Sequence, residues 1–155
     1  MRYVLIDRIT ALEPGRTLAA IKNVSLSDGL VTRVRFGVSA LPGSMVIEAM
    51  AQAAGLLIVG SLPELVQPVL AKVQPFTAYR DAIAGDRIDL HATLEDLRSE
   101  GARVQVTAVV DGRTIAEAMF YLGIMPIEGE RIAMMRERLA DLFPGWFDMT
   151  ASVGL

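Results

Sequence analysis

The sequence predicts an α+β domain in which an antiparallel β-sheet wraps around one long central helix, with an extra helix at the C-terminus. Residues 42–61 form one long and mostly apolar stretch. The strand-like segments that follow it show no alternation with helices, which argues against a parallel sheet. Asp111 and Gly112 join two of these segments and suit a two-residue hairpin turn, because both residue types can adopt positive φ.

The central helix is predicted over residues 42–61, PGSMVIEAMAQAAGLLIVGS. Ser44, Glu48 and Gln52 are spaced about one helical turn apart, so they lie on one polar stripe of an apolar helix. We expect Glu48 to be buried near the helix N-terminus, where burial disfavours its charge and free backbone N–H groups favour it. Such a carboxylate is either functional or a structural hydrogen-bonding group in the core or at a subunit interface.

The strands are predicted from alternation and from bounding turns. The segment 87–97 alternates best, with Ile88, Leu90 and Ala92 on one face and His91 among the polar residues of the other. We expect further strands at residues 17–25, 69–76, 103–110 and 113–124.

The C-terminal segment, residues 127–143, has its apolar residues Ile132, Met135, Leu139 and Leu142 at helical spacing. We therefore place the α+β domain in residues 1–126 and an amphipathic helix with its tail in residues 127–155. This helix either packs on its own domain or, because Trp146 and Phe147 follow it, serves as a lid or a partner-docking element.

Composition excludes several classes of protein. The chain has 155 residues, 52% hydrophobic and 21% charged, which indicates one globular domain with a substantial core. A net charge of −3 and few aromatic residues are not typical of a nucleic-acid-binding surface. Residues 45–60 are shorter than the roughly 20 residues that span a bilayer. MRYVLIDRIT lacks the pattern of a signal peptide, so we expect a cytoplasmic protein without a membrane span.

Five segments carry a resemblance to a known family: VLIDRITALEPG, AIKNVSLSDG, LPGSMVIEAMAQAAG, AIAGDRIDLHATLEDL and VVDGRTIAEAMF. In this order and spacing they resemble the 3-hydroxyacyl-acyl carrier protein dehydratases, with PGxxxIEAMAQ as the most specific part. The resemblance implies a hot-dog fold, in which the sheet wraps one helix. It also implies a dimer with active sites between the subunits, formed by two identical chains or with a related hot-dog subunit.

The family's reaction pairs the helix glutamate, here Glu48, with a histidine of the preceding loop, in the pattern H-F-P-G-x-P-x-M-P-G. The corresponding stretch here is VRFGVSALPG, residues 34–43, in which Gly37 and Gly43 match. Val34 stands at the position of the histidine, and valine cannot transfer a proton. His91, the only histidine, lies on the polar face of its strand and is not expected to replace it.

The resemblance also implies substrate-binding residues. The backbone N–H of Gly37 would hold the thioester carbonyl, while Gly43 and Gln52 follow the family's helix pattern. Arg33 and Arg35 flank Val34; they either bind the phosphate of a phosphopantetheine arm or an acidic carrier protein, or are solvated surface charges.

Three functional interpretations follow. The chain is a dehydratase-like protein that binds or acts on acyl thioesters of acyl carrier protein or coenzyme A in fatty-acid or related metabolism. Alternatively, it is an acyl thioesterase that uses Glu48, or a non-catalytic acyl-binding or heterodimer partner subunit. With one histidine, no cysteine and no glycine-rich phosphate loop, no metal or other cofactor is expected.

Overall fold

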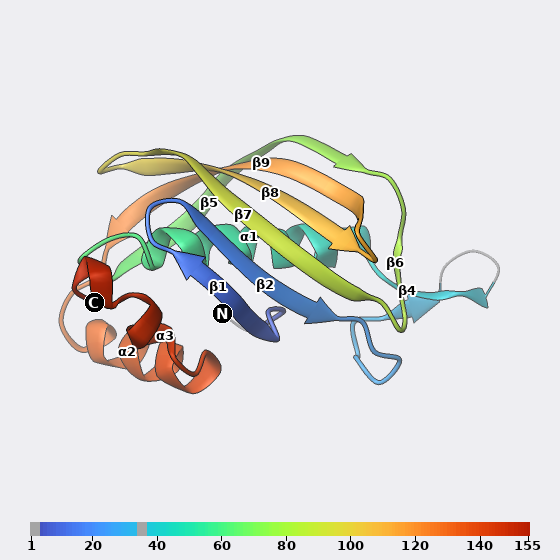
Figure 1. The fold of residues 1–155 in the computed structure, drawn as a ribbon, viewed down its shortest axis with the longest axis horizontal. Helices are drawn as coiled ribbons and strands as arrows, with labels where there is room; N and C mark the ends of the chain where they lie inside the picture. Colours follow the sequence, from blue (N-terminus) through green and yellow to red (C-terminus); the bar gives the residue numbers. More distant parts are fainter. Residues whose placement is uncertain (1–3, 34–36) are drawn as a thin grey trace.

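The computed structural model of the chain describes residues 4–33 and 37–155. One long helix, α1 (Gly43–Val59), is enclosed by an antiparallel sheet that curves around it (Figure 1). Among the described residues this sheet has six strands in the order β1-β2-β7-β8-β9-β5. Their bounds are Arg8–Glu13 (β1), Thr17–Asn23 (β2), Arg87–Leu97 (β7), Gly101–Val110 (β8), Arg113–Pro126 (β9) and Val66–Ala78 (β5). The predicted α+β class is confirmed.

A second, smaller sheet combines two strands that precede α1 in the sequence with one that follows it. Its strands β3 (Thr32–Arg33), β4 (Ser39–Leu41) and β6 (Ala82–Ile83) are all short, and they pair in the order β3-β4-β6. Pro42 follows β4 and begins α1 with φ −55° and ψ 143°, and its carbonyl accepts hydrogen bonds from Met45 and Val46. A proline at this point gives up no helical hydrogen bond, because the first N–H groups of a helix have no partner inside it.

The strand alternation predicted from sequence matches the burial. In β7, Ile88, Leu90 and Ala92 are buried, and His91 is exposed. The hairpin between β8 and β9 turns at Asp111 and Gly112, with φ values of 49° and 74°, as predicted.

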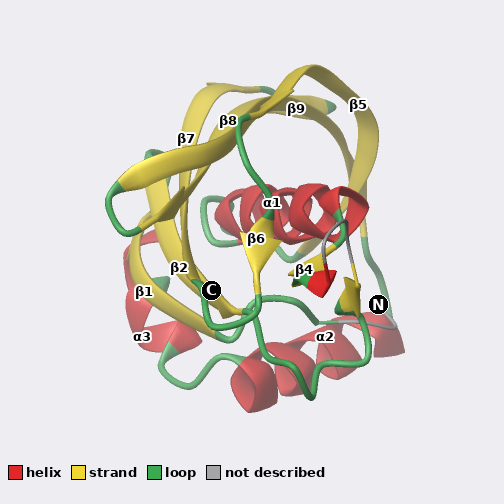
Figure 2. Cartoon of the chain, turned by 90° about the vertical axis from the view of Figure 1, so that its right-hand side faces the viewer, coloured by secondary structure: helices red, strands yellow, loops and turns green. Residues whose placement is uncertain are grey.

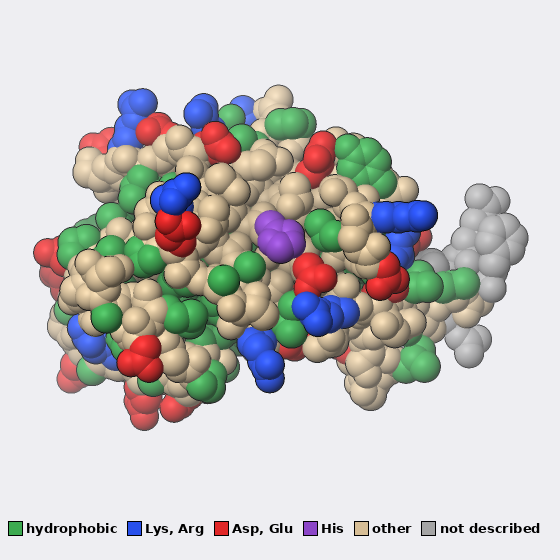
Figure 3. Space-filling view, in the orientation of Figure 1, with side chains coloured by type: hydrophobic (Ala, Val, Ile, Leu, Met, Phe, Trp, Pro, Cys, Tyr) green, Lys and Arg blue, Asp and Glu red, His purple; other side chains and the backbone are tan. Residues whose placement is uncertain are grey.

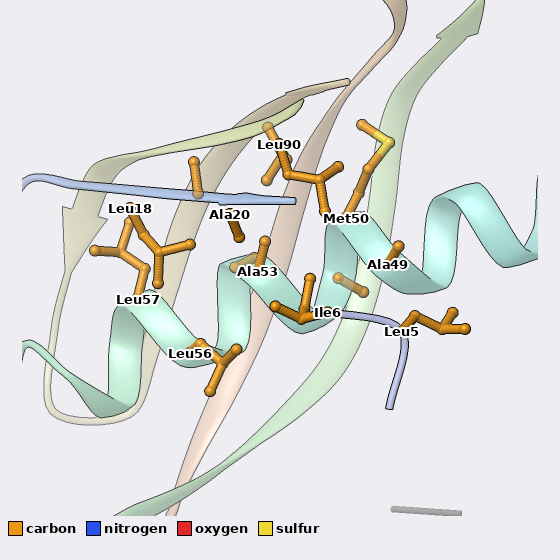
Figure 4. Close-up of a cluster of buried hydrophobic side chains, with 14 of the residues drawn as sticks. Leu5, Ile6, Leu18, Ala20, Ala49, Met50, Ala53, Leu56, Leu57 and Leu90 are labelled. Atoms are coloured by element: carbon orange, nitrogen blue, oxygen red, sulfur yellow. The ribbon is translucent and has the colours of Figure 1, made fainter. Parts of the chain in front are cut away.

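The core lies between α1 and the concave face of the sheet. Figure 4 shows Ala53 and Leu57 of α1 facing Leu18 and Ala20 of β2. The small alanines let the sheet approach the helix closely. Each fully buried leucine in this layer contributes roughly 1.5–3 kcal/mol relative to exposure.

The C-terminal segment forms α2 (Glu130–Leu142), α3 (Trp146–Met149) and a short 3₁₀ turn (Ala151–Val153). Figure 2 shows α2 on the side of α1 that the large sheet leaves open. Trp146 is 1% exposed, and its ring lies 6.3 Å from that of Phe143. Trp146 also approaches Gly60, where an added Cβ would lie 3.2 Å from the indole. This part of the tail therefore packs on its own chain.

No helix within residues 4–33 and 37–155 combines the length and the apolar character that crossing a bilayer requires.

Candidate functional site

Glu48 lies in the second turn of α1 and is exposed in the single chain, so the expectation that it is buried is wrong. The reason is the orientation of the helix: its Ser44–Glu48 edge faces the side that the sheet leaves open. The electrostatic effect of the helix N-terminus is concentrated in the first turn of α1, and Glu48 lies beyond that turn. The N-cap residue of α1 is Pro42, which makes no side-chain capping hydrogen bond.

Gln52 fixes the position of the Glu48 carboxylate. The side-chain amide of Gln52 donates a hydrogen bond from Nε2 to Glu48 Oε1 at 3.1 Å. Its Oε1 accepts a hydrogen bond from the backbone N–H of Leu5 at 2.9 Å. Because Gln52 is only 6% exposed and its oxygen is bound to the main chain, it holds the carboxylate in one orientation.

A cavity of about 300 Å³ opens beside this pair. Its walls come from α1, from β5 and β9, and from α2, and apolar side chains predominate. The polar lining is limited to four side chains among the described residues: Glu48, Gln52, Gln67 and Arg138. An apolar pocket of this size with a few polar groups at its wall is the usual form of a small-molecule site.

The remaining predicted site residues belong to the loop region before α1. Gly37 is exposed with φ 77°, a conformation that favours glycine, and Gly43 is the first residue of α1. Neither is among the described residues that line the cavity. The backbone of Arg33 pairs with Ser39 in the small sheet. Val34 and Arg35 lie outside the described residues, so their assigned places in the site stay predictions.

His91 lies on the outer face of the large sheet, away from α1. It pairs with Ala19 of β2 and Thr107 of β8 and is exposed. The single histidine is visible on the molecular surface in Figure 3. The His91 side chain therefore cannot approach Glu48 within the same chain, as the alternation of β7 predicted. Within the described part of the chain, no three histidine or acidic side chains gather as a metal site would require.

The sequence did not assign any of the α2 side chains to the site. Met135, Leu139 and Leu142 line the cavity, together with Arg138 and Phe143. The helical spacing of Met135, Leu139 and Leu142 predicts one apolar face of this helix. Spacing alone does not indicate which part of the molecule this face packs against.

The sequence comparisons identify related proteins. A family model of FabA-like domains matches residues 1–119. The 3-hydroxyacyl-acyl-carrier-protein dehydratase FabZ of Anaeromyxobacter sp. (strain Fw109-5) is 35% identical over 125 residues, which cover 76% of this chain and 78% of that protein. FabZ of Klebsiella pneumoniae subsp. pneumoniae is 34% identical over 119 residues, covering 75% and 79%.

The structural comparisons find the same fold in more distant proteins. The structure of smu.793 from Streptococcus mutans UA159 bound to acetyl CoA has a TM-score of 0.66 at 14% identity, covering 83% of this chain and 96% of that one. Thioesterase HI1161 from Haemophilus influenzae has a TM-score of 0.63 at 17% identity, covering 78% and 79%. At these identities the likeness concerns the fold alone, and it confirms the expected hot-dog fold.

Proposed function

This chain belongs to the family of FabA-like domains, and from that premise we propose that it binds acyl groups carried as thioesters in the cavity beside Glu48. The observation that carries the proposal is a carboxylate, oriented by Gln52, at the wall of an apolar cavity of about 300 Å³. An acyl chain suits the apolar walls. The carboxylate supplies an acid–base group at the reacting end of the thioester.

The family's dehydration needs two proton-transfer groups, one to remove the α-proton and one to assist the departure of the hydroxyl as water. Glu48 can serve as one of them. Val34 stands at the position of the other, and His91 lies on the outer face of the sheet. We therefore propose a dehydratase-like protein in which this chain alone does not perform the family's dehydration.

Thioester hydrolysis is a second candidate function, and the exposure of Glu48 favours it. A carboxylate in contact with solvent can take a proton from a water molecule that attacks the thioester carbonyl. The C–S bond then breaks, and the released sulfur takes up that proton, giving a carboxylic acid and a thiol. This reaction needs one proton-transfer group, so the replacement of the histidine does not prevent it.

We also propose which molecule carries the acyl group and how the chains assemble. The thioester is that of acyl carrier protein or coenzyme A, and Arg33 and Arg35 are our candidates for contact with the carrier's phosphate. We place the protein in the cytoplasm, as a dimer of identical chains or with a related hot-dog subunit. In the heterodimer, a histidine of the other subunit would complete the pair with Glu48.

Two assays on the purified protein test the function. A 3-hydroxyacyl thioester that gains enoyl absorbance reports dehydration, while a saturated acyl thioester that releases free thiol reports hydrolysis. If Glu48 is catalytic, Glu48→Gln lowers the active reaction by about 100-fold or more. Glu95→Gln, on the outer face of β7, is the matched control and leaves the rate unchanged.

The outcomes separate the interpretations. Thiol release that depends on Glu48 supports the thioesterase. Binding of acyl thioesters without turnover, measured by calorimetry, supports the acyl-binding subunit. Absence of both binding and turnover would reject the proposed function.

A further inference from the structure

We propose that α2 sets the length of acyl chain that the protein accepts, by closing the part of the cavity that lies away from Glu48. The inference rests on the proposed function, because it assumes that an acyl chain enters this cavity. It concerns a segment outside residues 1–119, the part of the chain that the family model matches.

The placement of α2 supports this role. The cavity lining on α1 runs from Glu48 to Val59, which is about 16 Å along the axis at about 1.5 Å per residue. Figure 1 shows α2 beneath the C-terminal half of α1, and Figure 2 shows it on the same open side. Glu48 and the α2 wall therefore lie toward different ends of the cavity.

The chemistry of the α2 wall suits a hydrocarbon chain. Met135, Leu139 and Phe143 present apolar side chains to the cavity, and Leu139 and Phe143 are each 6% exposed. Arg138 is the one polar side chain that α2 adds to the lining among the described residues, and the apolar side chains beside it suit a methyl terminus. Packing against it is the favourable alternative to leaving the chain end in water.

The volume limits the chain length. A cavity of about 150 Å³ holds a benzene ring, so about 300 Å³ has room for roughly twelve carbon atoms. With α2 in place, a longer chain would have to displace it or leave its end outside the cavity. We therefore expect affinity to rise with chain length up to about that size and then to fall, because displacing α2 exposes buried side chains.

Two residues allow the cavity to be changed in opposite directions. Leu142 lines it and is 37% exposed, so Leu142→Ala enlarges the cavity at little cost in stability. Gly55 lines it from α1, and an added Cβ would meet Pro68 at 3.7 Å, an ordinary contact. Gly55→Leu narrows the cavity and replaces a poor helix former with a good one, so weaker binding would not reflect a weaker helix.

The experiment measures affinity for butyryl-, hexanoyl-, octanoyl-, decanoyl-, dodecanoyl- and hexadecanoyl-coenzyme A by calorimetry. For wild type we expect the tightest binding near octanoyl to dodecanoyl and at least about tenfold weaker binding of hexadecanoyl. Leu142→Ala shifts the optimum to longer chains, and Gly55→Leu shifts it to shorter ones. Met134→Ala, on the same helix but 66% exposed and outside the cavity lining, leaves the profile unchanged.

Failure of this inference is distinct from failure of the proposed function. If acyl thioesters bind but Leu142→Ala and Gly55→Leu keep the wild-type profile, α2 does not set chain length and the proposed function stands. If wild type binds none of these thioesters, the proposed function is rejected and this inference with it.

Discussion

Lys22 is the one lysine among the described residues that is buried in the core, although nothing in the sequence analysis singled it out. It shares the inward face of β2 with Leu18 and Ala20 and is only 6% exposed. Its Nζ lies 3.0 Å from Asp28 Oδ2 and 3.9 Å from Asp7 Oδ1. Asp28 also accepts a hydrogen bond from the backbone N–H of Leu30. The pair ties the loop before β3 to the sheet.

Asp28→Asn should destabilise the protein by about 1–3 kcal/mol at neutral pH, because it leaves a buried ammonium with a weakened partner. Partial burial raises the pKa of Asp28, but hydrogen bonds from Lys22 and Leu30 and the charge of Lys22 bring it below its ordinary value of 3.8. A lowered pKa contributes stability above 3.8, and that contribution is lost as the pH falls through the folded-state pKa.

Urea unfolding of wild type and Asp28→Asn across this pH range provides the check. The difference in unfolding free energy should be largest at neutral pH and shrink below the ordinary pKa of the carboxyl. A difference that is independent of pH would mean that the ion pair contributes nothing to stability.

Val34→His should restore part of the family's dehydration, because an imidazole with a pKa near ~6.5 can remove a proton at neutral pH. In the family pattern H-F-P-G that VRFG resembles, Arg35 and Phe36 stand at the positions of the phenylalanine and the proline. We expect those two residues to aim the ring, and a misplacement of about 1 Å can cost roughly 100-fold. We therefore expect weak enoyl formation from the single variant. The triple variant Val34→His, Arg35→Phe, Phe36→Pro should be more active.

The activity of the triple variant should disappear when Glu48→Gln is added. If the triple variant folds, binds acyl thioesters and still forms no enoyl product, the site has diverged beyond its proton-transfer groups. The thioesterase or binding interpretation would then replace the dehydratase-like one.

At the residue scale, the sequence predicted which side chains lie together better than it predicted how exposed each of them is. The spacing of Glu48 and Gln52 predicted one polar stripe, and their hydrogen bond confirms it. The exposure of Glu48 depends on which side of α1 the sheet leaves open, and helical periodicity alone carries no such information. Lys22 could have been found, since the alternation of β2 places it on the face of Leu18 and Ala20.

At the element scale, strands with regular alternation were predicted closely and irregular ones were missed. The segment 87–97 coincides with β7 because its two faces differ sharply in polarity. In β1 the partly buried residues Ile9 and Leu12 are three apart, because the pairing register shifts between Ile9 and Ala11. Because of this bulge, buried and exposed side chains of β1 do not alternate with a period of two residues. β3 and β6, with two residues each, are too short to show any period.

Trp146→Ala should release the C-terminal segment while leaving the sheet and α1 folded. The indole is buried, and its Nε1 has no hydrogen-bond partner in the part of the chain that the structure describes, so packing alone holds it. Removing a buried tryptophan costs about 3–5 kcal/mol, more than a short helix can supply by itself. Trp146→Phe keeps most of the contact and leaves no polar atom unpaired.

Limited trypsin digestion measures this release, because Arg131, Arg136 and Arg138 all lie in α2. We expect rapid cleavage at these sites in Trp146→Ala and slow cleavage in wild type and Trp146→Phe. Equal protection of all three proteins would show that α2 is held by contacts other than Trp146.

At the scale of the whole molecule, the two edges of the large sheet differ. β1 forms one edge and is contacted by α3. β5 forms the other; it has thirteen residues and exposes Val69, Leu70 and Phe76. A long edge strand with exposed apolar side chains tends to associate. Since β5 also lines the cavity, a partner bound along it would lie beside the acyl site.

We predict a dimer by sedimentation at micromolar concentration, and Val69→Lys should shift it toward monomer by placing a charge on this edge. Leu26→Lys is the control, because Leu26 is 75% exposed in the loop after β2. A wild-type monomer would remove the argument for a site shared between subunits.

The central claim is that an acyl thioester occupies the cavity between α1 and α2 with its reacting end at Glu48. A crystal structure of the protein with decanoyl-coenzyme A tests it most directly. The account predicts that the acyl chain lies along α1 between Glu48 and Val59, that the thioester lies within reach of the Glu48 carboxylate, and that α2 covers the chain end. An acyl chain bound elsewhere, with this cavity unoccupied at saturating ligand, would contradict it.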